Sequence, residues 1–547
     1  MRLYSIILLL LIYSGIFAQN NRSWATYYGG SLNDYGKYLA TDMTGNIYLE
    51  GYTNSTNAIA SSGFQNVSGG SNDVYLVKFD AAGNRSWATY YGGIGDELAG
   101  GIITGDSGKI FFAGTTYSAS GIASGGFQNT FGGTKDAFLV CFDSTGNRIW
   151  ATYYGGSGLE TASDIITDAA GNIYLAGYTS STFGIASGGF QSTYGGGTSD
   201  AFLVKFDGAG NRIWATYYGG PGGDNCMSIA VDPTGNIIIT GLTESTSGIA
   251  SGGFQNSYGG GTSDSYIVKF DLNGNRLWAS YYGGTAMEDG YGVGTDAAGN
   301  IYLGGNTEST SGIANTGFQN IIGGGRDAFL VKFDMNGNRI WSSYYGGTGY
   351  DVLLTLTLDY SGNIFFGGRT GSTTSISSGG FQNTYGGGSN DSYLAAFDPA
   401  GNRLCATYYG GAGSDRGYDI VADSSGYIYF TGQTDTIAGI ASGGFQNTYG
   451  GGVVDALLVK FSSCALTSVS EQTRGNSFNV FPNPSSGKIT VENSGDITIY
   501  NVLGKLILLI RISGDKTEID MSDYPKGIYF IELRSGEKTV IQKLVLQ

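Results

Sequence analysis

The tryptophans of this chain recur at a nearly constant spacing, which constrains the fold more than any other feature of the sequence. All six stand in a motif close to NRIWATYYGG, and Cys405 occupies the tryptophan position of a seventh copy. Successive copies lie 63 or 64 residues apart. A fixed period of this length indicates a repeat architecture built from one small module. The tryptophans are Trp24, Trp87, Trp150, Trp214, Trp278 and Trp341.

Each repeat contains four strand-like runs rich in β-branched and aromatic residues and bounded by Gly, Asn and Asp. In the third copy they are Trp150–Tyr154, Ser163–Thr167, Asn172–Tyr178 and Asp200–Phe206. Two connections read D-x-x-G-N, and the late Gly supplies the positive φ of a bulged hairpin turn. Each unit is therefore predicted to be a four-stranded antiparallel meander. Seven such units predict an all-β fold, a seven-bladed β-propeller.

The ends of the repeat array predict how the ring closes. The strand Trp24–Tyr28 corresponds to the outermost strand of a blade, with no inner strands before it. The last repeat supplies three inner strands, ending at Asp455–Phe461, and lacks the outermost one. We expect the N-terminal strand to complete the last blade, because this pairing removes the open edge of a linear array.

The recurring segments GFQNTYGGG, DAFLVKFD and WATYYGG resemble the SBBP beta-propeller repeat family of exported bacterial proteins, over residues 22–461. This resemblance implies a fold and no defined activity.

Residues 478–547 resemble a second family, the type A C-terminal sorting domain of the type IX, or Por, secretion system. The matching pieces are Asn479–Pro484, Ile497–Lys505, Gly527–Phe530 and Lys543–Val545. The resemblance implies that the type IX machinery is a partner. It also implies release of this domain, followed by secretion or attachment to surface lipopolysaccharide. The short strands and turns of this segment predict a small β-sandwich.

The first residues have the layout of a secretory signal peptide. Arg2 precedes an apolar run from Ile6 to Phe17 that is too short to span a bilayer, and Ala18 follows. The predicted organisation is a signal peptide at 1–18, the propeller at 19–461, a linker at 462–477 and the sorting domain at 478–547. We expect a secreted or outer-surface protein that passes through the periplasm and has no transmembrane segment in its mature form.

Composition excludes several kinds of chemistry. The chain has no histidine, which removes Ser-His-Asp and Cys-His nucleophiles and histidine-ligated zinc. Its net charge of −16 makes nucleic acid an unsuitable partner. The cysteines fall at unrelated repeat positions, so they are predicted to be buried small hydrophobes and not a disulfide framework. They are Cys141, Cys226, Cys405 and Cys464.

Two acidic positions recur in all seven repeats and are the candidate binding residues. We expect both on the face that carries the channel mouth, the first as a ring around it. They could bind a cation such as calcium, the one cofactor considered, or accept backbone hydrogen bonds that close each loop. The first ring is Asp34, Glu97, Glu160, Asp224, Glu288, Asp351 and Asp415, and the second is Asp73, Asp136, Asp200, Asp264, Asp327, Asp391 and Asp455.

Two further repeated features have plain structural interpretations. An Asp and an Arg flank each turn between the third and fourth strands, as Asp143 and Arg148 do, and predict a cross-hairpin ion pair. The Phe of the repeated G-F-Q, such as Phe64, could stack on a sugar ring, but core packing that pins a long loop is the favoured interpretation.

These observations favour a non-catalytic surface protein that binds a glycan or a surface protein, or serves as a scaffold. One alternative is a carboxylate-based polysaccharide-degrading enzyme at the channel mouth. Such catalysis needs two carboxyl groups in distinct environments, which near-identical blades do not offer, so the chain is predicted not to be an enzyme. A calcium-dependent structural module is the other alternative. Non-repeated residues such as Met227, Asp289, Leu353 and Arg416 form no recognisable constellation in the sequence.

Overall fold

The computed structural model describes residues 22–105, 108–462, 479–483, 485–492, 495–501, 506–512, 516–535 and 538–546. The predicted signal peptide at 1–18 and the linker after residue 462 lie outside these ranges. The chain divides into two compact units, Met1–Ser468 and Val469–Gln547. Within the described ranges there is no α-helix, and accordingly none long and apolar enough to cross a membrane.

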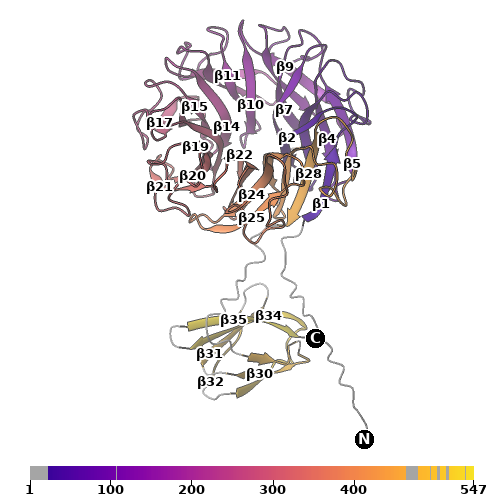
Figure 1. Ribbon diagram of the computed structural model, residues 1–547, viewed down its shortest axis with the longest axis vertical. Helices are drawn as coiled ribbons and strands as arrows, with labels where there is room; N and C mark the ends of the chain where they lie inside the picture. The colour runs from indigo at the N-terminus through magenta and orange to yellow at the C-terminus, as the bar shows by residue number, and fades with distance from the viewer. Residues whose placement is uncertain are drawn as a thin grey trace. The chain divides into compact units, whose positions relative to one another are not determined.

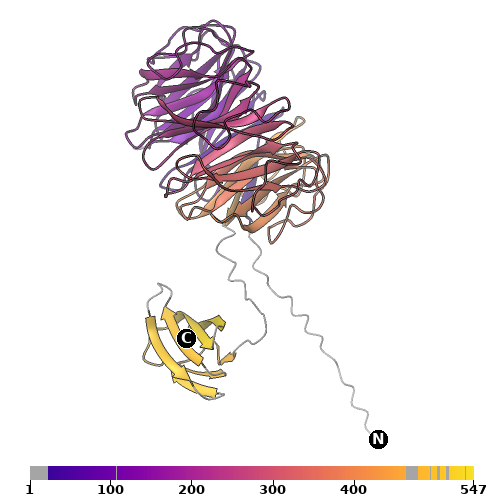
Figure 2. The same cartoon turned by 90° about the vertical axis from the view of Figure 1, so that its left-hand side faces the viewer.

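The first unit is a seven-bladed β-propeller, as the repeat predicts (Figures 1 and 2). Each blade is a four-stranded antiparallel sheet whose strands follow one another from the centre outward. Blade 1 contains β2 (Asp34–Thr41), β3 (Ile47–Thr53), β4 (Asp73–Phe79) and β5 (Arg85–Tyr91); blade 2 contains β6 (Glu97–Thr104), β7 (Ile110–Thr116), β8 (Asp136–Phe142) and β9 (Arg148–Tyr154); blade 3 contains β10 (Glu160–Thr167), β11 (Ile173–Thr179), β12 (Asp200–Phe206) and β13 (Arg212–Tyr218).

The remaining blades repeat this order. Blade 4 contains β14 (Asp224–Val231), β15 (Ile237–Thr243), β16 (Asp264–Phe270) and β17 (Arg276–Tyr282); blade 5 contains β18 (Glu288–Thr295), β19 (Ile301–Thr307), β20 (Asp327–Phe333) and β21 (Arg339–Tyr345); blade 6 contains β22 (Asp351–Leu358), β23 (Ile364–Thr370), β24 (Asp391–Phe397) and β25 (Arg403–Tyr409); blade 7 contains β26 (Asp415–Ala422), β27 (Tyr427–Thr434), β28 (Asp455–Ser462) and β1 (Arg22–Tyr28).

Strand β1 closes the ring, which confirms the prediction. It pairs antiparallel with β28, with Ala25 opposite Val459 and Tyr28 opposite Ala456. Figure 1 shows the indigo start of the chain beside the orange end of the propeller. Because the two ends of the repeat array share one sheet, opening the ring requires breaking a complete strand pairing.

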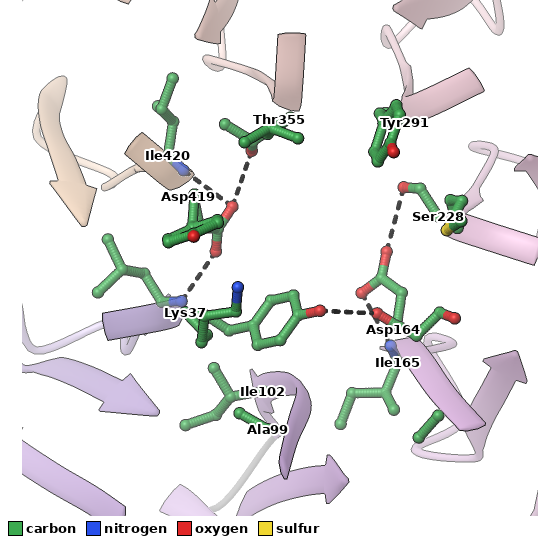
Figure 3. A pocket seen from close by; sticks show the side chains of 18 of the residues that line it. Lys37, Ala99, Ile102, Asp164, Ile165, Ser228, Tyr291, Thr355, Asp419 and Ile420 are labelled. Atoms are coloured by element: carbon green, nitrogen blue, oxygen red, sulfur yellow. Dashed lines mark hydrogen bonds between the residues drawn. The ribbon is translucent and has the colours of Figure 1, made fainter. Parts of the chain in front are cut away.

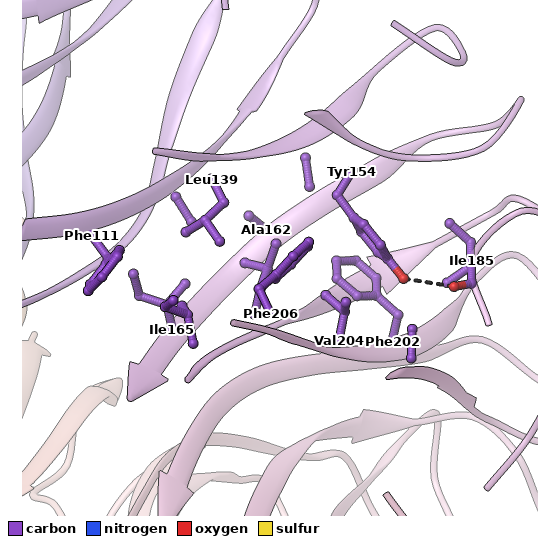
Figure 4. Close-up of a cluster of buried hydrophobic side chains, with 14 of the residues drawn as sticks. Phe111, Leu139, Tyr154, Ala162, Ile165, Ile185, Phe202, Val204 and Phe206 are labelled. Atoms are coloured by element: carbon purple, nitrogen blue, oxygen red, sulfur yellow. Dashed lines mark hydrogen bonds between the residues drawn. The ribbon is translucent and has the colours of Figure 1, made fainter. Parts of the chain in front are cut away.

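Apolar side chains fill the space between neighbouring blades. At the boundary of blades 2 and 3, Phe111 and Leu139 pack in one cluster with Phe202 and Phe206 (Figure 4). The strands are therefore buried on both faces, which explains why their sequences alternate so weakly. In the same cluster the Tyr154 hydroxyl donates to the carbonyl of Ile185 at 2.8 Å, which satisfies its polar end inside the core.

Each repeated tryptophan joins its blade to the next one. The Trp24 indole Nε1 donates to the carbonyl of Ala81 at 3.3 Å, and its ring lies against Gly83, where an added Cβ would stand 3.0 Å away. Ala81 and Gly83 belong to the turn between the third and fourth strands of the next blade. The equivalent bonds run from Trp87 to Ser144, Trp150 to Gly208, Trp214 to Leu272, Trp278 to Met335 and Trp341 to Pro399.

This contact explains the one break in the tryptophan series. Cys405 lies in blade 6, and blade 7 has no turn between its third and fourth strands because β1 supplies the fourth. A tryptophan there would have no turn to pack on. Cys405 is disulfide-bonded, so the prediction that the cysteines form no disulfide is wrong at this position. Cys141 and Cys226 are free and buried, as expected, and Cys464 lies outside the described residues.

The long loop between the second and third strands of a blade covers its outermost strand. In blade 1, Ser61 and Ala88 exchange two backbone hydrogen bonds of 2.8 and 2.9 Å, and Tyr90 N donates to the carbonyl of Gln65 at 2.9 Å. The same bonds recur around the ring, for example between Ser187 and Ala215. The loops therefore pair an edge that would otherwise be open to another chain.

The second unit consists of two sheets around one apolar core. One sheet has the order β29 (Asn479–Phe481), β30 (Lys488–Glu492), β33 (Lys516–Asp520), and the other has the order β32 (Leu506–Ile512), β31 (Gly495–Asn501), β34 (Gly527–Ser535), β35 (Lys538–Leu546). Buried side chains from both sheets, including Val491, Ile499 and Ile531, form one cluster. This arrangement matches the predicted small β-sandwich.

Candidate functional site

All fourteen candidate acids are buried, with 0% of each residue exposed. In the first ring, Asp34 accepts hydrogen bonds from Gly30 N at 2.8 Å and Ser55 Oγ at 3.0 Å, and also from the Thr53 hydroxyl. In the second ring, Asp73 accepts from Gly69 N at 2.6 Å. These bonds join the loops of one face to the starts of the strands. The contacts fit the loop-closing alternative, because a saccharide cannot reach a side chain without exposed surface.

The two rings meet as seven carboxyl pairs, one at each blade boundary. A side chain built on Gly155 would stand 2.5 Å from Glu160 Oε2 and 2.6 Å from Asp136 Oδ1, and only glycine fits there. At the closing boundary, Gly29 lies in the same way between Asp34 and Asp455. The pairs are Asp73 with Glu97, Asp136 with Glu160, Asp200 with Asp224, Asp264 with Glu288, Asp327 with Asp351, Asp391 with Asp415 and Asp455 with Asp34.

Burial raises the pKa of all seven carboxyl groups of the second ring. Burial, together with the neighbouring Glu288, raises the pKa of Asp264 to about 7. Burial and Asp34 do the same for the pKa of Asp455, also to about 7. Two carboxylates this close and this far from water favour the state in which one of them holds a proton. The carboxyl pairs therefore connect neighbouring blades through buried groups whose protonation depends on pH.

The predicted ion pairs across the hairpins do not form. Asp143 accepts from Thr145 and Asn147 within its own turn, and none of the Asp–Arg pairs is among the ion pairs within 4.0 Å in the described part of the chain. Arg148 instead lies over the ring of Phe64 in the preceding blade, 4.7 Å from its centroid, and donates to the carbonyl of Ile122 at 3.2 Å. The guanidinium is planar and stacks well on an aromatic face, so it joins two blades.

The same stacking occurs at every blade boundary, and it corrects the core prediction for the Phe of G-F-Q. Phe64 is 42% exposed, and its free face is covered by the arginine. The seven pairs are Arg22–Phe381, Arg85–Phe445, Arg148–Phe64, Arg212–Phe127, Arg276–Phe190, Arg339–Phe254 and Arg403–Phe318, at 4.4–5.2 Å. These rings are part of the junctions between blades, so they are poor candidates for sugar stacking.

The innermost strands of all seven blades surround a central channel that contains a cavity of about 460 Å³. Its lining includes Lys37 of blade 1, Met227 of blade 4 and Tyr291 of blade 5, which occupy equivalent positions of their innermost strands, so the lining changes from blade to blade (Figure 3). The channel is therefore the place where near-identical blades present different chemistry. A single site for one asymmetric ligand needs such differences, because identical blades would offer identical surroundings.

Sequence variation extends along the innermost strands and is greatest at one level of the channel, next to the first acid ring. It is formed by the second residue of each innermost strand and the residue opposite it on the next strand. The seven pairs, called here the mouth layer, are Tyr35/Tyr52, Leu98/Thr115, Thr161/Tyr178, Asn225/Leu242, Asp289/Asn306, Val352/Arg369 and Arg416/Gln433. Sequence reasoning missed this layer, although aligning the repeats and searching for the least repeated column would have found it.

Two acids, which occupy the same position in blades 3 and 7 and are absent from it in the other five blades, face each other deeper in the channel (Figure 3). Asp164 accepts from Ile165 N, Ile229 N and Ser228 Oγ at 2.8–3.1 Å. Asp419 accepts from Leu39 N, Ile420 N and Thr355 Oγ1, each at 2.8 Å. Burial raises the pKa of Asp164 to about 7 and that of Asp419 to about 6.

These contacts cross blade boundaries. Asp164 of blade 3 holds β14 of blade 4, and Asp419 of blade 7 holds β2 of blade 1 and β22 of blade 6. Glu50 does the same from β3, accepting from Gly101 N at 3.1 Å. Neighbouring innermost strands share no ladder, so these acids bridge them. All four oxygens of Asp164 and Asp419 accept hydrogen bonds from the protein, which leaves little capacity for proton transfer to a substrate.

Seven four-stranded sheets around a channel, together with a separate two-sheet domain, define this protein as a β-propeller with a C-terminal β-sandwich. The family model described as Beta-propeller repeat (SBBP) matches residues 23–57, 149–184 and 213–249. The model described as Secretion system C-terminal sorting domain (Por_Secre_tail) matches residues 479–547. The chain thus carries SBBP propeller repeats and a type IX sorting domain, which marks it for export to the cell surface or the medium.

Curated relatives match parts of the chain. The uncharacterized WD repeat-containing protein L264 of Acanthamoeba polyphaga mimivirus is 23% identical over 422 residues, covering 63% of this chain and 30% of the relative. The regulatory protein FlaEY of Caulobacter vibrioides is 26% identical over 227 residues, covering 41% of this chain and 22% of the relative. The chain therefore spans less than a third of the length of either relative.

Solved structures similar to this chain include YCF48 bound to D1 peptide, at 9% identity and a TM-score of 0.39, covering 81% of this chain and 96% of the other. PorZ, a surface component of the type IX secretion system of Porphyromonas gingivalis, has 13% identity and a TM-score of 0.27, covering 93% and 70%. Neither similarity says what the present chain binds.

Proposed function

We propose that this chain is a non-catalytic binding protein of the outer cell surface or the medium, in which the sorting domain delivers the propeller and the propeller recognises a glycan or a surface protein. The propeller supplies a rigid, closed ring. The mouth layer supplies a set of side chains that differs from blade to blade.

The observation that carries this proposal is the distribution of sequence variation. The acid rings, the tryptophans and the Arg–Phe stacks repeat around the ring and serve blade packing. The mouth layer combines Tyr, Arg, Asp, Asn and Leu at one structural position. Packing alone would be served by the same residues in each blade, so the variation fits selection for a ligand.

A carboxylate-based enzyme is the alternative that a specific observation favours, since only blades 3 and 7 carry an acid, Asp164 and Asp419, at this position of the innermost strand. Against it, each of the two carboxyl groups already accepts three hydrogen bonds from the protein. Their pKa values also lie close together, whereas acid and base roles need two groups with well-separated values. An enzyme would release new reducing ends or unsaturated products from a polysaccharide. An Asp164→Asn variant that keeps its fold should lose that release if the enzyme interpretation holds.

The direct test is a screen of the full chain against glycans, polysaccharides and surface proteins, run with and without EDTA. The proposal predicts at least one specific ligand, bound without product formation and with unchanged affinity in EDTA. Binding lost in EDTA would support the calcium-dependent alternative. Product formation that depends on Asp164 would support the enzyme, and absence of any ligand would contradict the binding proposal.

A further inference from the structure

We propose that one half of the channel mouth is a binding site for an acidic saccharide, whose carboxylate or sulfate groups would be held by Lys37, Arg369 and Arg416. The inference rests on the proposed binding function and names its ligand class. The site is called here the basic half of the mouth; it belongs to blades 5, 6, 7 and 1, which are consecutive in the ring.

The cations of the propeller fall into two groups. Twelve stand at repeated positions, the arginines that begin outermost strands and the lysines of the third strands. Of the other six, Lys135 and Arg326 share one position, directly before the third strand, whereas Lys37, Arg369 and Arg416 each stand alone at their positions and line or adjoin the mouth of the channel. In a chain with a net charge of −16, this gathering of cations has no counterpart at the other blades.

The register of the strands places these cations together. Arg416 and Arg369 occupy the mouth layer in blades 7 and 6, opposite Gln433 and Val352. Lys37 is the bulged residue of β2, one step below that layer in blade 1. Arg326 directly precedes β20, the third strand of blade 5, and its Nη2 forms an ion pair of 2.7 Å with Asp289 of the mouth layer.

Three of the four cations are not neutralised by the protein. Lys37, Arg369 and Arg416 have no carboxylate within 4.0 Å among the described residues. They also act on one another, because burial and the charge of Arg416 lower the pKa of Lys37 to about 8 and also lower that of Arg369. A bound anion reduces the electrostatic repulsion between like charges that are held together in a partly buried site. The guanidinium groups suit carboxylate and sulfate through paired N–H donors.

Aromatic rings beside these cations identify a saccharide as the better occupant. Tyr35 and Tyr52 of blade 1 stack with ring centroids 4.4 Å apart, and Tyr418 of blade 7 is partly exposed next to them. Tyr291 lines the same channel from blade 5. Partly exposed tyrosine rings offer flat apolar faces and hydroxyl groups, which suit the C–H faces and hydroxyls of a sugar ring. The opposite half of the mouth layer has no charged side chain.

The charge of the whole chain does not prevent this binding. At physiological salt the Debye length is about 8 Å, so the acids of the hairpin turns and the outer surface act weakly on a ligand at the mouth, while the cations beside it are screened much less. A flexible polyanion without ring faces, such as an acidic peptide, would gain only the charge contacts. We therefore expect a preference for saccharides that carry acid groups on their rings.

The experiment measures affinities of the full chain by calorimetry for hexagalacturonate, its fully methyl-esterified form, a sulfated galactan hexasaccharide and hexaglutamate. The variant R369Q/R416Q removes two cations of the site. Lys109→Gln is the matched control, because Lys109 is a non-repeated cation next to the hairpin turn at the other end of β7. Thermal unfolding of each variant checks that the fold is kept.

The proposal predicts that hexagalacturonate or the sulfated hexasaccharide binds, and that the methyl ester and hexaglutamate bind at least about tenfold more weakly. The variant R369Q/R416Q should lose about 10- to 100-fold in affinity for the acidic saccharide, whereas Lys109→Gln should leave the affinity unchanged. Equal binding of acid and ester would overturn it, as would equal binding of the peptide or an equal loss in the control variant. If these saccharides fail but the wider screen finds a neutral glycan or a protein, this inference falls and the proposed binding function stands.

Discussion

The ammonium group of Lys37 lies 3.3 Å from the centroid of the Tyr418 ring. The contact joins β2 of blade 1 to β26 of blade 7, two strands from opposite ends of the propeller sequence. A cation over an aromatic face in a partly desolvated site contributes about 0.5–2 kcal/mol. It holds the Lys37 charge at the channel mouth, beside Arg416, without neutralising it.

This arrangement predicts how the affinity for an acidic ligand depends on pH. Burial and Arg416 lower the pKa of Lys37 to about 8, so the ammonium loses its proton as pH rises from 7 to 9. Asp419, which accepts a hydrogen bond from Leu39 N close to Lys37, and Asp164 across the channel ionise at lower pH and act in the same direction. Affinity for hexagalacturonate should therefore fall as pH rises. In Lys37→Arg the fall between pH 7 and 9 should flatten, because arginine keeps its charge. A rise in wild-type affinity over this range would contradict the assignment.

The carboxyl pairs predict an unusual pH dependence of stability. Burial and Glu288 raise the pKa of Asp264 above its unfolded value, so the folded state binds more protons than the unfolded state between about pH 4 and 7. The stability that this group contributes is fully present below pH 4 and is lost as pH rises through 7. The hairpin aspartates act in the opposite sense, since hydrogen bonds outweigh burial and lower the pKa of Asp232 to about 2. Their contribution is lost only as pH falls from about 4 to 2.

Together these groups should place the maximum of thermal stability near pH 4–6. Tm measured by calorimetry should rise as pH is lowered from 7.5 to 5. The variant Asp264→Asn should show a smaller rise, whereas Asp359→Asn, in an exposed hairpin turn, should keep the wild-type rise. A Tm that falls steadily from pH 7.5 to 5 would show that the pairs do not hold protons.

The disulfide of Cys405 should stabilise the closing region of the ring. A peptide map without reductant should show the Cys405 peptide cross-linked, whereas Cys141 and Cys226 should be recovered as free thiols. Reduction, or the variant Cys405→Ser, should lower the free energy of unfolding by about 2–4 kcal/mol. Cys141→Ser is the control that leaves the cross-link in place. An unlinked Cys405 peptide from protein prepared under oxidising conditions would contradict the assignment.

The sorting domain should act as a targeting signal for secretion and should not be needed for the propeller to fold. Truncation after Ser477 in the native host should leave a folded propeller that accumulates in the periplasm. The reason is that the propeller unit has its own closed core, while residues 479–547 match the sorting domain. Limited proteolysis would check the fold, and cell fractionation the location. Delivery of the truncated chain to the surface or the medium would mean that the address lies elsewhere.

The sequence predicts the propeller well because its evidence is periodic. The spacing of Trp150 and Trp214 gives the blade, and the unmatched strand Trp24–Tyr28 gives the closure. The side-chain contacts of repeated residues were harder to predict, because the partner nearest in the sequence is not the partner nearest in the folded propeller. Arg148 is five residues from Asp143, yet it stacks on Phe64 of the previous blade.

The channel site was hidden from the sequence for a related reason. Lys37, Arg369 and Arg416 stand in three different repeats, and each is unremarkable in its own. Only the ring brings them to one place. The two acid rings were recognised in the sequence, but their pairing and burial were not. Asp34 and Asp455, for example, come together only because the propeller closes.

The most direct test of a ligand-binding channel mouth is a crystal structure of the full chain with the tightest ligand from the screen. The account predicts an acidic saccharide seated at the mouth layer, with its acid groups within hydrogen-bond distance of Arg369 and Arg416 and a sugar ring against a tyrosine of blade 1 or 7. A ligand found on the outer strands or the loop face, with the channel mouth unoccupied, would contradict it.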